Sequence, residues 1–156
     1  MIYADWRGSI FNRRQFVLIV VSMKFFTTGY TGKPVEQLSA LLDFHEATLA
    51  DIRFAPLSQH LRWTKDYLTV LLKNRYRHVA ALGNRNYKTG GKIQIHNLEI
   101  GIRLLESWET NVILMCACEE LENCHRRVVK NELEKRGHEV EEITSWDVSQ
   151  LLLFGS

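Results

Sequence analysis

Cysteine is scarce in this sequence. Three cysteines occur among 156 residues, and all of them lie between Cys116 and Cys124. Small secreted domains that are held together by disulfides carry an even number of cysteines at spaced positions, and this chain does not. We therefore expect the protein to work in a reducing compartment, the cytoplasm.

Long apolar runs are also missing. The apolar core near the N-terminus, residues 16–21, is far shorter than the roughly 20 residues that a membrane-spanning helix needs, and Lys24 follows it closely. No small-residue cleavage pattern follows it, which disfavours a secretory signal peptide. We expect no membrane partner. We interpret residues 1–22 as an N-terminal extension or an over-long start, and residues 23–156 as a single α/β domain.

The chain has little net charge, but acidic residues are absent from one stretch. A formal charge of +2, with 46% hydrophobic and 24% charged residues, is typical of a globular protein and does not by itself indicate a nucleic-acid partner. Residues 67–98 contain no Asp or Glu. The basic residues of this stretch are Lys73, Arg75, Arg77, Arg85, Lys88 and Lys92. With the tyrosines among them they are the best case for nucleic-acid binding, although a solvated basic face is the simpler interpretation.

Two nucleotide-binding motifs are absent as well. The loop at residues 29–33 does not match the P-loop pattern G-x-x-x-x-G-K-[ST], and no G-x-G-x-x-G follows the first apolar run after Met23. Hydride transfer is therefore less favoured than group transfer or hydrolysis, and the sequence leaves the cofactor open.

Short apolar runs alternate with amphipathic segments through the rest of the chain. The apolar runs predict strands at residues 24–28, 48–52, 77–82, 112–118 and 138–143. The amphipathic segments predict helices that follow Pro34, span residues 61–72, follow an N-cap at Asn97 and span residues 124–136. The tail from Ser145 is expected to form a partial helix or a packed strap. This alternation predicts one three-layer α/β domain of flavodoxin-like or Rossmann-like type, with a mostly parallel sheet of about five strands flanked by helices.

The loops that follow the predicted strands are the expected place for a ligand. In parallel sheets, ligands bind at the carboxyl ends of the strands, where the strand order reverses. The loops at this edge should be residues 28–33, 51–56, 83–92 and 116–126.

The last of these loops opens a helix with unusual residues at its start. Asn123 is suited to cap the helix, and Gly137 is the expected residue just beyond its end. Cys124, His125 and Arg126 would then lie in the first turn. Free N–H groups and the helix dipole favour an anion there and lower the pKa of a thiol.

The segment LMCACEELENCHRRVVKNELEKRGHEVEEI resembles the C-terminal signature of the domain-of-unknown-function 488 family, in which Cys-His-Arg opens a helix that Arg-Gly-His closes. Three earlier segments are similar to the family pattern, namely Thr27-Thr28-Gly29-Tyr30-Thr31, Asp51-Ile52-Arg53 and Leu82-Gly83. Tyr30 stands where the family usually has His, so a role of that His in proton transfer does not carry over. The resemblance spans Lys24 to Ile143 and implies an α/β fold and a prokaryotic or phage origin, but no reaction.

The candidate catalytic residues are Asp51, Cys124 and His125. Asp51 is a possible base or ribose-hydroxyl acceptor, or simply an ion-pair partner of Arg53. His125 suits acid–base chemistry near neutral pH. The candidate ligand-binding residues are Thr28, Gly29, Tyr30, Thr31, Arg53, Cys118 and Arg126. Arg126 would fork onto a phosphate or carboxylate, or would only cap the helix and pair with neighbouring glutamates.

The three cysteines and His125 form the pattern C-x-C-x(5)-C-H, which offers four possible zinc ligands. Adjacent residues such as Cys124 and His125 rarely ligate one metal, and no C-x-x-C pair is present, so we assign no metal site. A redox pair of Cys118 with Cys124 is an alternative. The simplest interpretation of Cys116 and Cys118 is that they are small buried strand residues.

Together these features predict an enzyme that acts by transfer or hydrolysis on a small anionic ligand, such as a nucleotide or sugar phosphate. A non-catalytic module that binds a ligand or nucleic acid is the alternative, and a zinc or thiol redox protein is a further one. The oligomeric state stays open.

Overall fold

The computed structural model describes residues 22–154. Residues 1–21 and 155–156 lie outside the described part. The interpretation of residues 1–22 as an extension therefore falls almost entirely outside the described residues.

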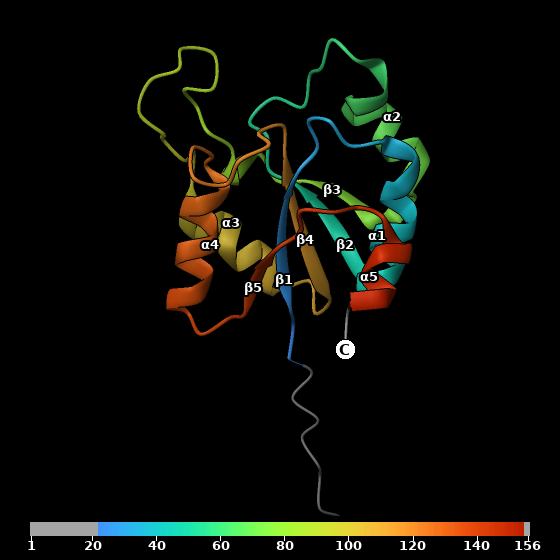
Figure 1. The fold of residues 1–156 in the computed structure, drawn as a ribbon. Helices are drawn as coiled ribbons and strands as arrows, with labels where there is room; N and C mark the ends of the chain where they lie inside the picture. Colours follow the sequence, from blue (N-terminus) through green and yellow to red (C-terminus); the bar gives the residue numbers. More distant parts are fainter. Residues whose placement is uncertain (1–21, 155–156) are drawn as a thin grey trace, which may run out of the picture.

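Within residues 22–154, five strands form a single sheet, and all of its pairings are parallel. The strand order across the sheet is β3-β2-β4-β1-β5 (Figure 1). The strands are β1 (Phe25–Gly29), β2 (Ala47–Asp51), β3 (Tyr76–His78), β4 (Asn111–Cys116) and β5 (Val140–Glu142). This confirms the predicted three-layer α/β domain with a mostly parallel sheet.

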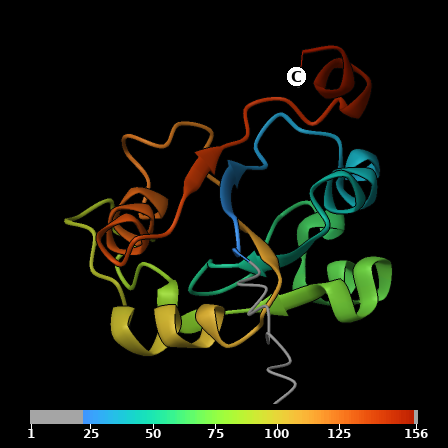
Figure 2. The ribbon, with the colours of Figure 1, turned by 90° about the horizontal axis from the view of Figure 1, so that it is seen from below.

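Helices cover both faces of the sheet. They are α1 (Leu38–His45), α2 (Lys65–Leu72), α3 (Leu98–Glu106), α4 (Arg126–Lys135) and α5 (Val148–Phe154). Figure 2 shows α1, α2 and α5 on one side and α3 and α4 on the other. No helix among residues 22–154 is long and apolar enough to cross a membrane.

Alternate residues of β4 point to opposite faces of the sheet and pack into two separate hydrophobic cores. In β4, Ile113 and Met115 pack with α1 and α2, whereas Val112 and Leu114 pack with α3 and α4. Because both faces of the sheet are covered, every residue of β1 and β2 and all but the first of β4 are buried. This is why β4 is readable as a continuous apolar run.

Several predicted elements have different bounds in the structure, and the strand predicted at residues 112–118 ends at Cys116. The predicted strand at residues 77–82 ends at His78, and Ala80–Leu82 form a 3₁₀ turn instead. The predicted helix at residues 61–72 is interrupted at Thr64, whose hydroxyl accepts a bond from the Tyr67 N–H and caps α2. An apolar pattern does not separate a short strand from a 3₁₀ turn, and it does not reveal a break inside a helix.

Helix α4 begins later than predicted, while its end is as predicted. His125, and not Asn123, is the residue that precedes the helix, and its side chain makes no capping bond. Gly137 has a φ of 88°. The His138 N–H bonds to the Leu133 carbonyl at 3.1 Å and the Gly137 N–H to the Glu134 carbonyl at 3.0 Å, a Schellman motif.

The centre of the sheet is a topological switch point. β1 and β4 are neighbours, but the chain leaves β1 through α1 toward β2 and leaves β4 through α4 toward β5 on the other face. The backbone pairing continues past the strand ends, because the Tyr30 N–H donates to the Cys116 carbonyl at 3.0 Å. The loops then diverge, and this is where parallel sheets bind ligands.

Gly29, the last residue of β1, is predicted to be irreplaceable at this crossing. A Cβ built on Gly29 would lie 1.7 Å from the Cys118 carbonyl oxygen. Gly29→Ala must therefore displace the loop after β4, and we expect it to lower the free energy of unfolding by about 3 kcal/mol, measured by urea denaturation. Gly91→Ala is the matched control, because the nearest atom to a Cβ built on Gly91 is the Thr89 hydroxyl oxygen, at 3.5 Å. Equal stability of the two variants would contradict this account.

Candidate functional site

A cavity of about 370 Å³ lies at the carboxyl edge of the sheet. All four loops that were predicted to share this edge contribute to its wall, which confirms that they lie together. The polar side chains on the wall are Tyr30, Arg53, Asn84, Asn86, Tyr87, Cys118, Asn123 and His125. Four of the predicted site residues are among them: Tyr30, Arg53, Cys118 and His125.

Arg53 is held on the wall by Asp51. The Arg53 Nε–H donates to Asp51 Oδ1 at 2.8 Å, and Nη2 donates to Oδ2 at 2.5 Å. Tyr76 donates its hydroxyl to the same carboxylate at 2.7 Å. Burial acts to lower the pKa of Arg53, but the bond and attraction to Asp51 outweigh it and raise the pKa. Asp51 is fully buried. Of the two predicted roles of Asp51, the structure shows the ion pair with Arg53. The role of Asp51 as a base stays a prediction.

Tyr30 is fixed between two neighbours. Its ring stacks on Trp63 with centroids 4.3 Å apart and an interplanar angle of 12°. Its hydroxyl accepts a bond from Arg53 Nη1 at 3.2 Å. Tyr30 is therefore a fixed part of the wall that borders Arg53.

The other residues predicted in the first loop make structural contacts. The Thr28 hydroxyl donates to the Ile143 carbonyl at 3.0 Å and accepts from Trp146 Nε1 at 2.8 Å. The Thr31 hydroxyl donates to the Ala117 carbonyl at 2.5 Å. Gly29 packs against the Cys118 carbonyl. Their predicted contacts with a ligand stay predictions.

Arg126 is engaged by the far edge of the sheet. Its side chain is fully buried, and Nη1 donates to Glu142 Oε1 at 2.9 Å. Nη2 donates to the Cys118 carbonyl at 3.0 Å. Burial acts to lower the pKa of Arg126, but its interactions with Cys116 and Cys124 and the bond and attraction to Glu142 outweigh it and raise the pKa. The guanidinium that was predicted to fork onto an anion forks instead onto Glu142 in β5.

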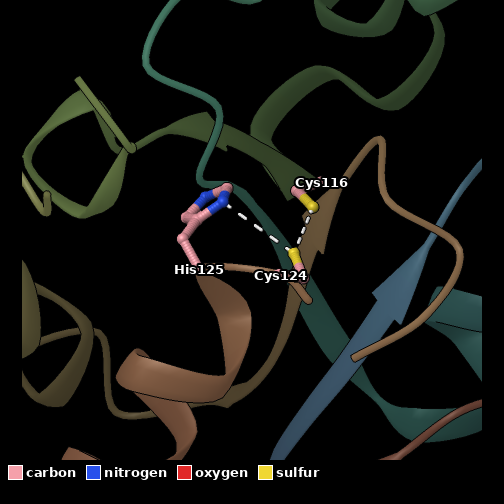
Figure 3. Close-up of side chains that lie close together, drawn as sticks. All are labelled: Cys116, Cys124 and His125. Carbon is pink, nitrogen blue, oxygen red and sulfur yellow. Dashed lines mark hydrogen bonds between the residues drawn. The ribbon is translucent and has the colours of Figure 1, made fainter. Parts of the chain in front are cut away.

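Two thiols and one imidazole meet beside the cavity (Figure 3). Cys116 Sγ at the end of β4 lies 2.9 Å from Cys124 Sγ, and Cys124 Sγ lies 3.8 Å from His125 Nδ1. All three residues are buried, whereas Cys118 is exposed on the wall. These distances bring together residues from β4 and from the start of α4.

The pKa values of the three cysteines are shifted in different directions. Hydrogen bonds from Cys116 and Cys124 lower the pKa of the exposed Cys118 thiol. For Cys116, the bonds with the other two thiols and then burial raise the pKa. For Cys124, the bond with Cys116 lowers the pKa, but the bond with Cys118 and burial outweigh it and raise the pKa. The pKa of Cys124 is therefore raised, in contrast to the lowering predicted for a thiol at the helix start.

His125 has a defined tautomer. Its Nε2 lies 2.8 Å from the Ile52 carbonyl, which can only accept, so Nε2 carries the hydrogen and Nδ1 is left with a lone pair. Burial is the main reason that the pKa of His125 is lowered. The neutral imidazole presents Nδ1 toward Cys124.

Phe54, Asn84, Asn86 and Tyr87 also form part of the wall, and none of them was among the predicted site residues, although their two loops were predicted to lie at this edge. Residues 84–93 form a turn-rich loop that folds on itself, since Asn84 Oδ1 accepts bonds from the Asn86 N–H at 3.1 Å and the Gln94 N–H at 3.0 Å. The cluster of asparagine and glycine between residues 83 and 91 was the available signal, because such residues shape ordered loops as well as mobile ones.

Comparisons of this chain with family models, with curated protein sequences and with solved structures found no match. The function is therefore argued from the residues themselves.

The Asp51–Arg53 pair gives a prediction about stability. Asp51→Asn leaves the guanidinium buried without its counter-charge, and we expect a loss of about 3–5 kcal/mol in the free energy of unfolding. Tyr76→Phe is the matched control, because it removes one bond to the same carboxylate and should cost about 1 kcal/mol. Urea denaturation measures both. If Asp51→Asn cost no more than Tyr76→Phe, the structural role of Asp51 would be wrong.

Proposed function

We propose that this protein is an enzyme that transfers or hydrolyses a group on a small anionic ligand, such as a nucleotide or sugar phosphate, bound in the cavity at the carboxyl edge of the sheet. The observation that carries the proposal is the convergence on one cavity at the switch point of Arg53, from the loop after β2, with Cys118 and His125, from the loop after β4. A volume of about 370 Å³ suits a ligand of this size.

The wall supports recognition of a ligand with a ring. Phe54 and Tyr87 place aromatic surface on the wall, with ring centroids 6.3 Å apart. Asn86 Nδ2 is used to bind the Lys92 carbonyl at 2.7 Å, while its Oδ1 and the Asn123 amide have no hydrogen-bond partner among the described residues. A planar group that carries donors and acceptors fits such a surface.

The positive charge for an anion comes mainly from one loop. Arg53 is balanced by Asp51, and Arg126 by Glu142. The loop that forms one wall carries Arg85, Lys88 and Lys92, all exposed, and contains no acidic residue. His125, the residue before α4, also lies on the wall, so the positive end of that helix borders the cavity. These features favour an anionic group at the cavity.

Cys118 is the exposed thiol on the wall, and we assign the chemistry to it. His125 would act by its contacts with the Ile52 carbonyl and Cys124, which engage both of its ring nitrogens. Asp51 would act by positioning Arg53, and Cys124 by its contact with Cys116. The Cys-His-Arg segment supports membership of the domain-of-unknown-function 488 family as part of the proposal. The odd number of free cysteines supports a cytoplasmic location.

Tyr87 allows a test of the cavity. We expect a panel of nucleotides and sugar phosphates, screened by thermal shift and isothermal calorimetry, to contain a ligand that binds and is turned over. Tyr87→Ala should raise the Kd for that ligand about tenfold, because a ring contact is lost. Tyr87 is 45% exposed, so the fold should tolerate the change.

Phe44→Ala is the matched control, since Phe44 is an aromatic residue of α1 that is 37% exposed and lies outside the cavity wall. The Phe44→Ala variant should bind the ligand with the same Kd as the unaltered protein. Binding without any turnover would contradict the enzyme and would support the non-catalytic module. An equal effect of both substitutions would contradict the cavity as the binding site.

A further inference from the structure

The cluster of Cys116, Cys124 and His125 has the composition of a metal site. One ligand atom from each residue, two Sγ and one Nδ1, lies within 4.8 Å of the others, and all three residues are buried (Figure 3). Soft thiolate sulfur together with imidazole nitrogen is a donor set that suits Zn²⁺ and disfavours Mg²⁺ and Ca²⁺.

We propose that Cys116, Cys124 and His125 bind one Zn²⁺ ion through Sγ, Sγ and Nδ1, with the fourth coordination position open to the cavity. The binding of the ion is independent of the proposed ligand. A part for the ion in catalysis rests on the proposed function.

The sulfur-to-nitrogen distance is close to that of a tetrahedral site, whereas the two sulfurs lie closer together than in such a site. Zinc bonds of about 2.3 Å to sulfur and about 2.0 Å to nitrogen place the two sulfurs about 3.8 Å apart and sulfur and nitrogen about 3.5 Å apart. The corresponding distances between Cys116 and Cys124 and between Cys124 and His125 are 2.9 Å and 3.8 Å. The ligand atoms of all three residues lie within 4.8 Å of one another, and binding the ion would require the two sulfurs to separate by about 0.9 Å.

The groups around the cluster orient its donor atoms. The Nε2–H of His125 is bound to the Ile52 carbonyl at 2.8 Å, which directs the Nδ1 lone pair to the cluster. The Cys118 N–H donates to Cys116 Sγ at 3.3 Å, and the Arg126 N–H donates to Cys124 Sγ at 3.4 Å. Backbone carbonyls behind ligating histidines and N–H donors to sulfur are the second-shell contacts that hold metal ligands in place.

The charges also balance. Two thiolates and a neutral imidazole around Zn²⁺ make a unit with no net charge, so forming it buries no uncompensated charge beside the fully buried Arg126. Arg126 is itself paired with Glu142. The ion therefore fits the electrostatics of the neighbourhood.

The sequence argument against a metal was that Cys124 and His125 are adjacent. In the structure both residues precede the first residue of α4, and the imidazole reaches Cys124 Sγ through the ring nitrogen nearer the backbone, Nδ1. The second sulfur comes from the end of β4, eight residues earlier. Adjacency is thus compatible with one shared site.

The cluster opens toward the cavity on one side. Cys116 and His125, which are 1% and 8% exposed, contribute to the cavity wall, whereas Cys124 does not. Zinc sites with three protein ligands and an open position are typical of catalysis, where the metal polarises an oxygen of the substrate or activates a water. A ligand in the cavity would lie next to the open position.

Cobalt provides the direct test. We expect the fully reduced, metal-free protein to bind one equivalent of Co²⁺ without any organic ligand. The spectrum should show thiolate-to-cobalt charge transfer and the intense visible bands of a tetrahedral ion, and one equivalent of Zn²⁺ should abolish them. X-ray absorption on the zinc-loaded protein should show two sulfur neighbours at about 2.3 Å. Absence of Co²⁺ binding, or three sulfur neighbours, would overturn the proposal.

Cysteine-to-serine variants identify the donors. Cys124→Ser should raise the Kd for Co²⁺ at least about a hundredfold and weaken the charge-transfer band. Cys118→Ser is the matched control from the same loop and should leave the Kd within about threefold of the unaltered protein. An equal loss in both variants would overturn the assigned donor set. If Cys124→Ser does not fold, as judged by circular dichroism, the X-ray absorption result decides. None of these readouts involves turnover, so they stand apart from the test of the cavity ligand.

Discussion

The parallel pairing of β1 with β4 is the constraint on which the rest of the structure depends. Gly29 stands opposite Cys116 in this register, at the ends of both strands. Because the two strands feed helices on opposite faces of the sheet, their loops separate and leave a cavity between them. The missing side chain of Gly29 lets the Cys118 carbonyl pass directly over it. The position of the loop after β4, which carries Cys118, is therefore set by its contact with β1, a strand that is far away in the sequence.

Buried charge is neutralised in pairs around this crossing. Arg53 pairs with Asp51, which lies two residues earlier at the end of β2. Arg126 pairs with Glu142 in β5. Removing charges from water is costly, and each guanidinium is compensated by a carboxylate and by backbone carbonyls. Both arginines thereby hold the loops of the cavity in place. The excess positive charge at its mouth is left to the exposed loop after Gly83.

The start of α4 is shaped by the same packing. His125 is anchored to the Ile52 carbonyl, at the end of β2, and Cys124 is pressed against Cys116 at the end of β4. The residues that begin the helix are thus held by two strands of the sheet. This explains why a cluster of thiols and imidazole forms beside the cavity, with its donor atoms directed at one point.

The sequence by itself determined the features that depend on neighbours along the chain. Continuous apolar runs marked the buried strands, Asn97 caps α3 by accepting the Ile100 N–H at 3.1 Å, and Gly137 ends α4. The shared edge of the loops followed from the rule for parallel sheets. The tertiary structure decided which side chains of those loops face the cavity. Arg126 turns to Glu142 and Cys124 is buried because their partners come from other strands, and such contacts leave no periodic signal in the sequence.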